Sequence, residues 1–171
     1  ISLGIIAIIL LSVSCACLSS DGNTENAEYL RIHVRANSNS EEDQRVKYLV
    51  KDGIVGAITP LVAEITSKEE AVRVMTEQKE RLEAIADGIL SNNGFSYKCE
   101  IVVRNEKFPT RVYDGVTLKS GYYDALIVNL GKAEGDNWWC VVYPPLCFGN
   151  AKPVYRSKIA EIIAKFKRRA R

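Results

Sequence analysis

The hydrophobic residues of the chain follow a period of two in some segments and a helical period in others. Alternation begins at Tyr29 and continues to Ala36, with apolar residues at every second position. Arg31, His33 and Arg35 fall on the opposite face. A period of two is typical of a strand with one buried face, so we predict a half-buried strand at 29–36.

Two amphipathic helices are predicted next. Ser40 is followed three residues later by an aspartate, the spacing of a capping box, and apolar residues then recur at helical spacing through 46–65. Pro60 should bend or end this helix, because proline removes a backbone donor at a cost of about 3 kcal/mol. Ser67 repeats the capping signal, and the Asn-Asn-Gly sequence at 92–94 should end the second helix.

The period returns to two after residue 95. Strands are predicted at 97–104, 111–118, 122–130 and 137–143. The last is apolar on both faces, so it should be central or covered. This order of elements is not the regular alternation of a doubly wound fold. It predicts an α+β domain, in which two long amphipathic helices cover one face of a mixed or antiparallel sheet of about four to five strands.

Composition adds a targeting segment at the start. The chain has 171 residues, of which 47% are hydrophobic and 26% charged, and these values favour one globular domain. Residues 1–20 carry no charged side chain. We expect them to form a signal peptide cleaved after Ala16, or a retained membrane anchor.

The basic charge is concentrated at the other end, in a tail at 149–171. The formal net charge is +2, yet residues 158–171 alone carry six Lys or Arg and one Glu. With apolar residues at 159, 162, 163 and 166, this segment is typical of a helix on a membrane surface. Nucleic-acid binding is a rival interpretation that export disfavours, and a solvated helix end is the plain alternative.

The cysteines agree with export. Cys140 and Cys147 enclose a short loop that contains two prolines, and an oxidising compartment could join them as a disulfide. Closure of so short a loop contributes about 2.5 kcal/mol on the chain-entropy estimate. Cys99 is expected to be a small buried hydrophobic residue. We predict no metal site and no cofactor, because the chain has no CxxC pair and His33 is its one histidine.

Candidate catalytic residues are few. His33 near Asp43 could act as a general base, but a histidine flanked by arginines on a strand is more often a surface or supporting residue. Pairing of His33 with Cys140 as a thiolate site is weaker, since Cys140 has a better partner in Cys147. The sequence contains no glycine-rich phosphate loop, GxSxG, HExxH or Walker motif. We therefore predict no enzyme.

The aromatic residues of the last predicted strand are the other candidate. Trp138 and Trp139 are adjacent, so one ring should lie on each face of the strand and at least one should be core. The other could anchor a partner, because tryptophan and tyrosine supply large contact areas at interfaces.

Several strings resemble the stage II sporulation protein R family. They are Arg31-Ile32-His33-Val34, Ala36-Asn37-Ser38, Asp43-Gln44, Phe108-Pro109-Thr110-Arg111, Gly121-Tyr122-Tyr123-Asp124-Ala125-Leu126, Gly131, Asn137-Trp138-Trp139-Cys140-Val141 and Pro144-Pro145-Leu146-Cys147-Phe148. The tryptophan, cysteine and double-proline strings are the most specific. Together the strings define a signalling domain at 29–148.

The resemblance implies a function that composition does not. It implies a secreted signal of endospore-forming bacteria, released into the space between the forespore and mother-cell membranes. There it would activate a membrane-embedded aspartic protease of the mother cell, which matures the precursor of the mother-cell sigma factor. No nucleic acid partner is implied. An exported cell-wall hydrolase or an anchored envelope-binding module is the alternative.

Under this interpretation, one face of the domain contacts the protease. The expected partner-binding residues are Arg35, Asn37, Asp43, Arg111, Asn137, Trp138, Trp139 and Tyr143, with the Cys140–Cys147 pair as a clasp. For each of them, maintenance of the fold is the alternative role.

Overall fold

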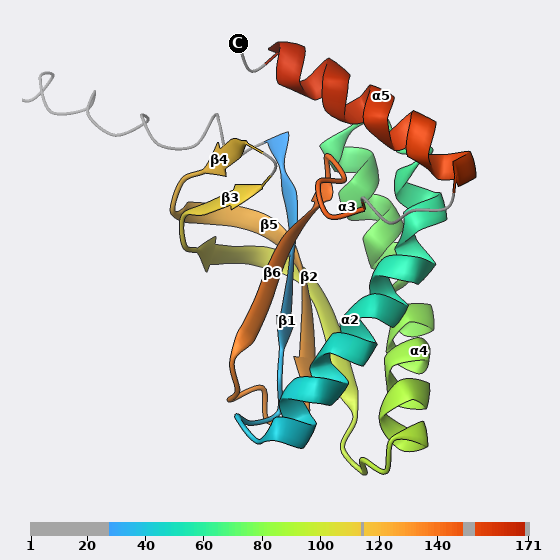
Figure 1. Ribbon diagram of the computed structural model, residues 1–171, viewed down its shortest axis with the longest axis vertical. Helices are drawn as coiled ribbons and strands as arrows, with labels where there is room; N and C mark the ends of the chain where they lie inside the picture. The colour runs from blue at the N-terminus through green and yellow to red at the C-terminus, as the bar shows by residue number, and fades with distance from the viewer. Residues whose placement is uncertain (1–27, 114, 149–152, 170–171) are drawn as a thin grey trace, which may run out of the picture.

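The computed structural model describes residues 28–113, 115–148 and 153–169. Its main sheet consists of β1 (Leu30–Arg35), β2 (Cys99–Phe108), β5 (Gly121–Leu130) and β6 (Asn137–Tyr143). The strand order is β2-β5-β1-β6. β1 runs parallel to β5, and the other neighbours are antiparallel. The predicted α+β class is therefore confirmed, and of the two sheet types predicted, mixed or antiparallel with about four to five strands, the structure has a mixed sheet of four (Figure 1).

Helices cover one face of this sheet (Figure 1). They are α2 (Glu41–Val62), α3 (Lys68–Glu77) and α4 (Lys79–Asn92). Both predicted caps are present, since Ser40 Oγ accepts from the Asp43 amide at 3.2 Å and Ser67 Oγ from the Glu70 amide at 3.1 Å. Pro60 lies in the last turn of α2, where the helix ends two residues later.

The prediction of a single second helix was wrong. The helix is interrupted at Gln78, which is both the C-cap of α3 and the N-cap of α4. The buried side chains of α3 are Ala71 and Met75, while α4 buries Leu82 and Ala86. The apolar spacing alone cannot reveal the break, because it continues across it.

The opposite face of the sheet is also covered, so the prediction of a half-buried first strand was wrong. Arg31 and His33 are 0% and 1% exposed. They lie on the side of an apolar cluster that includes Phe108, Tyr123 and Val141. The predicted strand at 111–118 is in fact two short strands, which form a separate hairpin beside this cluster (Figure 1). These strands are β3 (Arg111–Tyr113) and β4 (Val116–Leu118).

β6 is an edge strand and is not central, although both of its faces are covered. Trp138 packs against the core on the helix side, and Trp139 packs against the cluster on the other side. The expectation of one tryptophan ring on each face is confirmed.

The basic tail forms α5 (Pro153–Arg169). Its apolar side faces the body of the protein, since Ile159 is buried and Phe166 packs on the rings of Tyr29 and Tyr143. Within the described ranges, no helix combines the length and the apolar character that crossing a bilayer requires. The targeting segment predicted at 1–20 lies outside the described residues.

Candidate functional site

The turn after β1 is built around Asp43. Its carboxylate accepts hydrogen bonds from Ser38 Oγ at 2.6 Å, Asn37 Nδ2 at 2.8 Å and the Tyr97 hydroxyl at 2.6 Å. Asn37 Oδ1 in turn accepts from the Lys132 amide at 3.0 Å. Two of the predicted partner-binding residues, Asn37 and Asp43, thus hold the turn with bonds inside the molecule.

The electrostatics of this turn follow from burial and these bonds. Desolvation acts to raise the pKa of Asp43, but the hydrogen bonds from Ser38, Tyr97 and Asn37 outweigh it and hold the pKa below its ordinary value of 3.8. Burial, followed by the bond to Asp43, raises the pKa of the Tyr97 phenol. Asp43 is therefore a carboxylate, and Tyr97 a hydrogen-bond donor, at neutral pH.

A second polar group lies on the sheet face away from the helices, and we call it the His33 cluster: His33, Arg35, Arg104, Glu106 and Trp139. His33 Nδ1 is 2.8 Å from Glu106 Oε1, and Arg35 Nη2 donates to the same oxygen at 2.6 Å. Arg104 Nη2 donates to Glu106 Oε2 at 2.9 Å. The Trp139 ring stacks on His33 with centroids 3.7 Å apart, because the two residues are cross-strand partners.

Burial decides what His33 can do. Desolvation lowers the pKa of His33 below 6.5, although the bond to Glu106 acts to raise it. For Glu106, desolvation acts to raise the pKa. The hydrogen bonds from Arg104 and His33 and the charge of Arg35 outweigh it, so the pKa of Glu106 lies below its ordinary value. His33 Nδ1 faces Glu106 and Nε2 is buried, so the ring has no open side for a substrate. Of the two roles expected for His33, a surface or a supporting residue, the surface position was wrong, because the side chain is buried against Glu106.

The depressed pKa of His33 predicts a pH-dependent stability. As the pH falls from about 7.5 to about 5, the unfolded chain takes up this proton before the folded chain does, so the free energy of unfolding falls. The carboxylates with lowered pKa values, Asp43 and Glu106, lose their contribution only at more acidic pH. Urea unfolding across this range should show a slope in the parent that His33→Gln flattens. Equal slopes in the two proteins would contradict the burial argument.

The register of β1 with β6 brings most of the predicted residues together. Arg35 lies opposite Asn137, Val34 opposite Trp138 and His33 opposite Trp139. The turn that holds Asn37 and Asp43 follows at the same end of the strand.

Two predicted residues lie elsewhere. Tyr143 pairs with Leu30 at the other end of β1, and its hydroxyl donates to the Thr66 carbonyl oxygen at 2.7 Å. Arg111 is exposed on β3 and bonds the carbonyl oxygen of Thr110 at 3.2 Å.

Sequence reasoning missed Glu106 and Arg104, the residues of β2 that complete the His33 cluster. Glu106 lies 73 residues from His33 along the chain. The alternation of residues in the strand shows which face of the sheet Glu106 lies on, but not which residue of another strand it contacts. No local signal could therefore have identified it.

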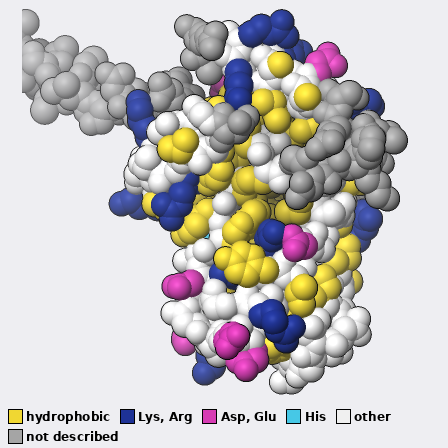
Figure 2. All heavy atoms as spheres, viewed as in Figure 1, with side chains coloured by type: hydrophobic (Ala, Val, Ile, Leu, Met, Phe, Trp, Pro, Cys, Tyr) yellow, Lys and Arg dark blue, Asp and Glu magenta, His cyan; other side chains and the backbone are white. Residues whose placement is uncertain are grey.

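A partly exposed aromatic surface lies beside the edge strand, and we call it the Trp138 surface: exposed Tyr48 with half-buried Lys51 and Trp138. Tyr48 is 49% exposed on α2. Lys51 Nζ lies 5.5 Å from the centre of the Trp138 ring and 6.0 Å from that of Tyr48. Figure 2 shows hydrophobic side chains gathered over β6 and the adjoining part of α2. Aromatic rings beside a cation are typical of the residues that dominate protein interfaces.

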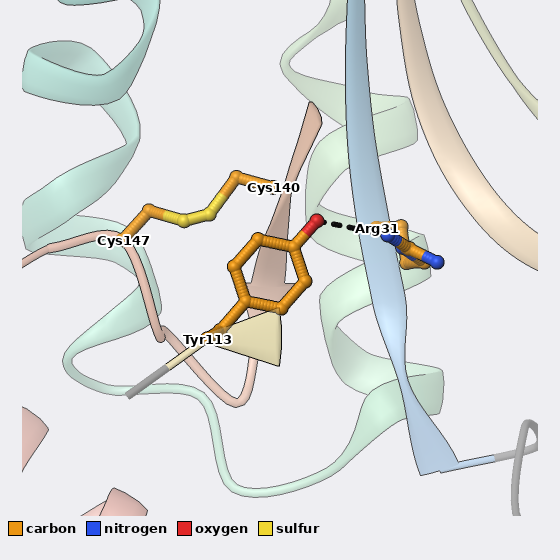
Figure 3. The surroundings of a disulfide bond; sticks show 4 residues. All are labelled: Arg31, Tyr113, Cys140 and Cys147. Atoms are coloured by element: carbon orange, nitrogen blue, oxygen red, sulfur yellow. Dashed lines mark hydrogen bonds between the residues drawn. A yellow bond between two sulfur atoms is a disulfide. The ribbon is translucent and has the colours of Figure 1, made fainter. Parts of the chain in front are cut away.

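The predicted disulfide between Cys140 and Cys147 is present, with Cα atoms 6.3 Å apart (Figure 3). It ties β6 to the proline-containing loop that follows. Cys99 is buried as expected, and burial raises the pKa of its thiol to about 12, so it is not a nucleophile. Among the side chains that the structure describes, no group of three or more potential metal ligands lies together.

Comparison with known proteins places this arrangement in a family. The family model for stage II sporulation protein R matches residues 26–153. The chain is similar to the stage II sporulation protein R of Bacillus subtilis (strain 168), with 37% identity over 119 residues, 70% of this chain. It spans about half, 53%, of that relative's length. No solved structure matches the chain. On this evidence the chain belongs to the stage II sporulation protein R family.

Proposed function

We propose that the protein is a secreted signal that activates a membrane-embedded aspartic protease of the mother cell and so causes maturation of the mother-cell sigma factor precursor. Membership of the family gives the chain a sporulation-related role. The family is named for sporulation and not for an enzymatic activity. The proposed place of action is the space between the forespore and mother-cell membranes.

The observation that carries the proposal is the Trp138 surface. It offers two aromatic rings and a lysine on the helix side of the edge strand β6. Truncation of one such anchor at an interface commonly costs 2 kcal/mol or more. We propose that this surface, together with Trp139 and Arg35 on the opposite side of the same sheet edge, contacts the extracellular part of the protease.

The proposed mechanism is selection of the active state of the protease. A ligand shifts a two-state equilibrium only by the difference between its affinities for the two states. A change from mostly inactive to mostly active protease requires a preference of about 5 kcal/mol. Two or three anchors of the Trp138 surface that contact only the active state would be enough.

Tyr48→Ala and Trp138→Ala are expected to reduce activation. Loss of one anchor worth about 2 kcal/mol should raise the concentration for half-maximal activation roughly 30-fold. Because Tyr48 is half exposed, its truncation should leave the unfolding midpoint unchanged, which separates contact from folding. Precursor cleavage against ligand concentration measures the effect. Tyr122→Ala, which removes an exposed ring elsewhere, is the matched control. Full activity of both surface variants would disprove this contact.

The basic tail is proposed to contact the membrane surface through charge alone, because the apolar side of α5 faces the protein. Each Lys or Arg near an anionic surface contributes about 1 kcal/mol. Replacing exposed Arg168 and Arg169 by alanine should therefore weaken binding to anionic vesicles about 30-fold, and raised salt should do the same. Co-sedimentation measures this, with Arg81→Ala as control. Vesicle binding that changes neither with raised salt nor with the replacement of both arginines would refute the proposal.

The alternative of a cell-wall hydrolase gains no support from the candidate residues. His33 and Asp43 are buried. His33 already bonds Glu106, and Asp43 already accepts hydrogen bonds within the turn after β1. An acid or base must come within hydrogen-bond reach of its substrate, and neither side chain is open to one.

A further inference from the structure

Arg31 is a buried cation with no acidic partner among the residues described. Its side chain is 0% exposed. Nη2 donates to the Tyr113 hydroxyl at 2.8 Å, whereas Nε and Nη1 have no hydrogen-bond partner among the described residues. Burial lowers the pKa of Arg31, yet a guanidinium remains charged in proteins. A buried charge is costly unless it is paired and hydrogen-bonded.

Aromatic rings compensate for part of this cost. The guanidinium carbon lies 4.2 Å from the centre of the Phe108 ring, 4.8 Å from that of Tyr123 and 5.7 Å from that of Tyr113. Ring faces attract the positive charge, but they do not replace an oxygen acceptor for the in-plane N–H groups. Methionine in this place would fill the aromatic pocket without burying a charge. The cation therefore needs an explanation other than stability.

The cover over Arg31 is attached to the rest of the protein by side-chain packing and by its short links to β2 and β5. Tyr113 is the last residue of β3, and the β3–β4 hairpin consists of two strands of three residues each. The hairpin forms a sheet of its own and has no backbone ladder with the main sheet. Tyr113, Val116 and buried Leu118 pack on the apolar cluster, but two strands of three residues that pair only with each other open at a lower free energy than the core. Figure 3 shows the Tyr113 hydroxyl directed at Arg31.

We propose that Arg31 is a binding site for a carboxylate that a protein partner supplies, reached when the β3–β4 hairpin moves Tyr113 aside. A planar guanidinium matches a carboxylate in geometry and charge, and such hydrogen bonds are about twice as strong as neutral ones. The aromatic walls supply the apolar surroundings that strengthen the pair. The identity of the partner as the protease rests on the proposed function. The binding of a carboxylate does not.

The carboxylate site is tested without the protease. Sodium acetate, titrated into the exported chain against sodium chloride at equal ionic strength, should shift the Nε–H resonance of Arg31 and increase hydrogen exchange in the β3–β4 hairpin. Arg31→Met assigns the resonance and should abolish the acetate effect on exchange. Tyr113→Ala, which removes the cover, should strengthen the acetate response. No acetate-specific shift in either the parent or Tyr113→Ala would overturn the site.

The role in signalling is tested by activation. Arg31→Met should unfold at the same or a higher temperature than the parent and yet lose at least ten-fold in precursor cleavage. Precursor cleavage by Arg31→Met equal to that of the parent would contradict the proposal that a carboxylate of the partner binds Arg31. If Arg31→Met does not fold, Arg31→Lys replaces it in the test, because lysine keeps the charge without the planar guanidinium. Full activity of Arg31→Lys would also contradict a carboxylate of the partner at this site. If the parent binds acetate at Arg31 but activates no protease, the proposed function fails and the site stands.

Discussion

Asp43→Ala is expected to destabilise the protein by about 3 kcal/mol, because hydrogen bonds to a charged acceptor contribute about 1.5–3 kcal/mol each and water replaces them only in part. The variant leaves Asn37, Ser38 and Tyr97 without their common acceptor. It also loosens the connection to the loop after β5. Gly131 in that loop has a φ of 55° and no room for a Cβ against Asn37 Oδ1. Urea unfolding measures the loss.

Asp52→Ala is the matched control for this variant. Asp52 is an exposed residue of the same helix and pairs only with neighbouring Lys51 among the contacts of described residues. Surface substitutions of this kind stay within about 0.5 kcal/mol. If Asp43→Ala were as mild as Asp52→Ala, the turn would not depend on the carboxylate. Asn37 and Asp43 would then be open again as contacts for a partner.

Glu106→Ala is expected to cost a similar amount, about 3 kcal/mol, since removal of one member of a buried ion pair leaves an uncompensated charge. Its carboxylate serves His33, Arg35 and Arg104 together, and its side chain is 14% exposed. Loss of the carboxylate should also lower the pKa of His33 further, because the bond to Glu106 is the main influence that raises it. Thermal unfolding and histidine titration by NMR measure the two effects.

Glu100→Ala provides the comparison on the same strand. Glu100 is exposed, and within the described ranges its carboxylate accepts one long hydrogen bond, 3.4 Å, from Asn129. We expect a change below about 0.5 kcal/mol. A Glu106→Ala variant as stable as Glu100→Ala would mean that water replaces the carboxylate. The His33 cluster would then contribute nothing to stability.

The elements that the sequence predicted correctly are those with local signals. Ser40 and Ser67 cap their helices through bonds to amides three residues later. The alternation of 29–36 predicted β1 for the same reason. The cover on the second face of β1 could not be predicted, since it comes from strands of three residues about 80 positions further along the chain.

The sequence predicted which residues form the candidate site better than it predicted how they are arranged. Trp138 and Trp139 lie on opposite faces of β6, as two adjacent strand residues must. The stacking of Trp139 on His33 depends on the β1–β6 register, which sequence periodicity leaves open. Arg31 appeared as one polar residue of an alternating strand. Its burial, with no acid paired to it in the described part of the chain, follows from tertiary packing alone.

The central claim is that this chain is sufficient to activate the mother-cell protease. The direct measurement is co-expression of the exported chain with the membrane-embedded aspartic protease and its sigma factor precursor in a host that makes no spores, with precursor cleavage read by immunoblot. The account predicts cleavage only when the chain is present, reduced by Tyr48→Ala and preserved by Tyr122→Ala. An intact precursor beside an exported, folded chain would contradict it.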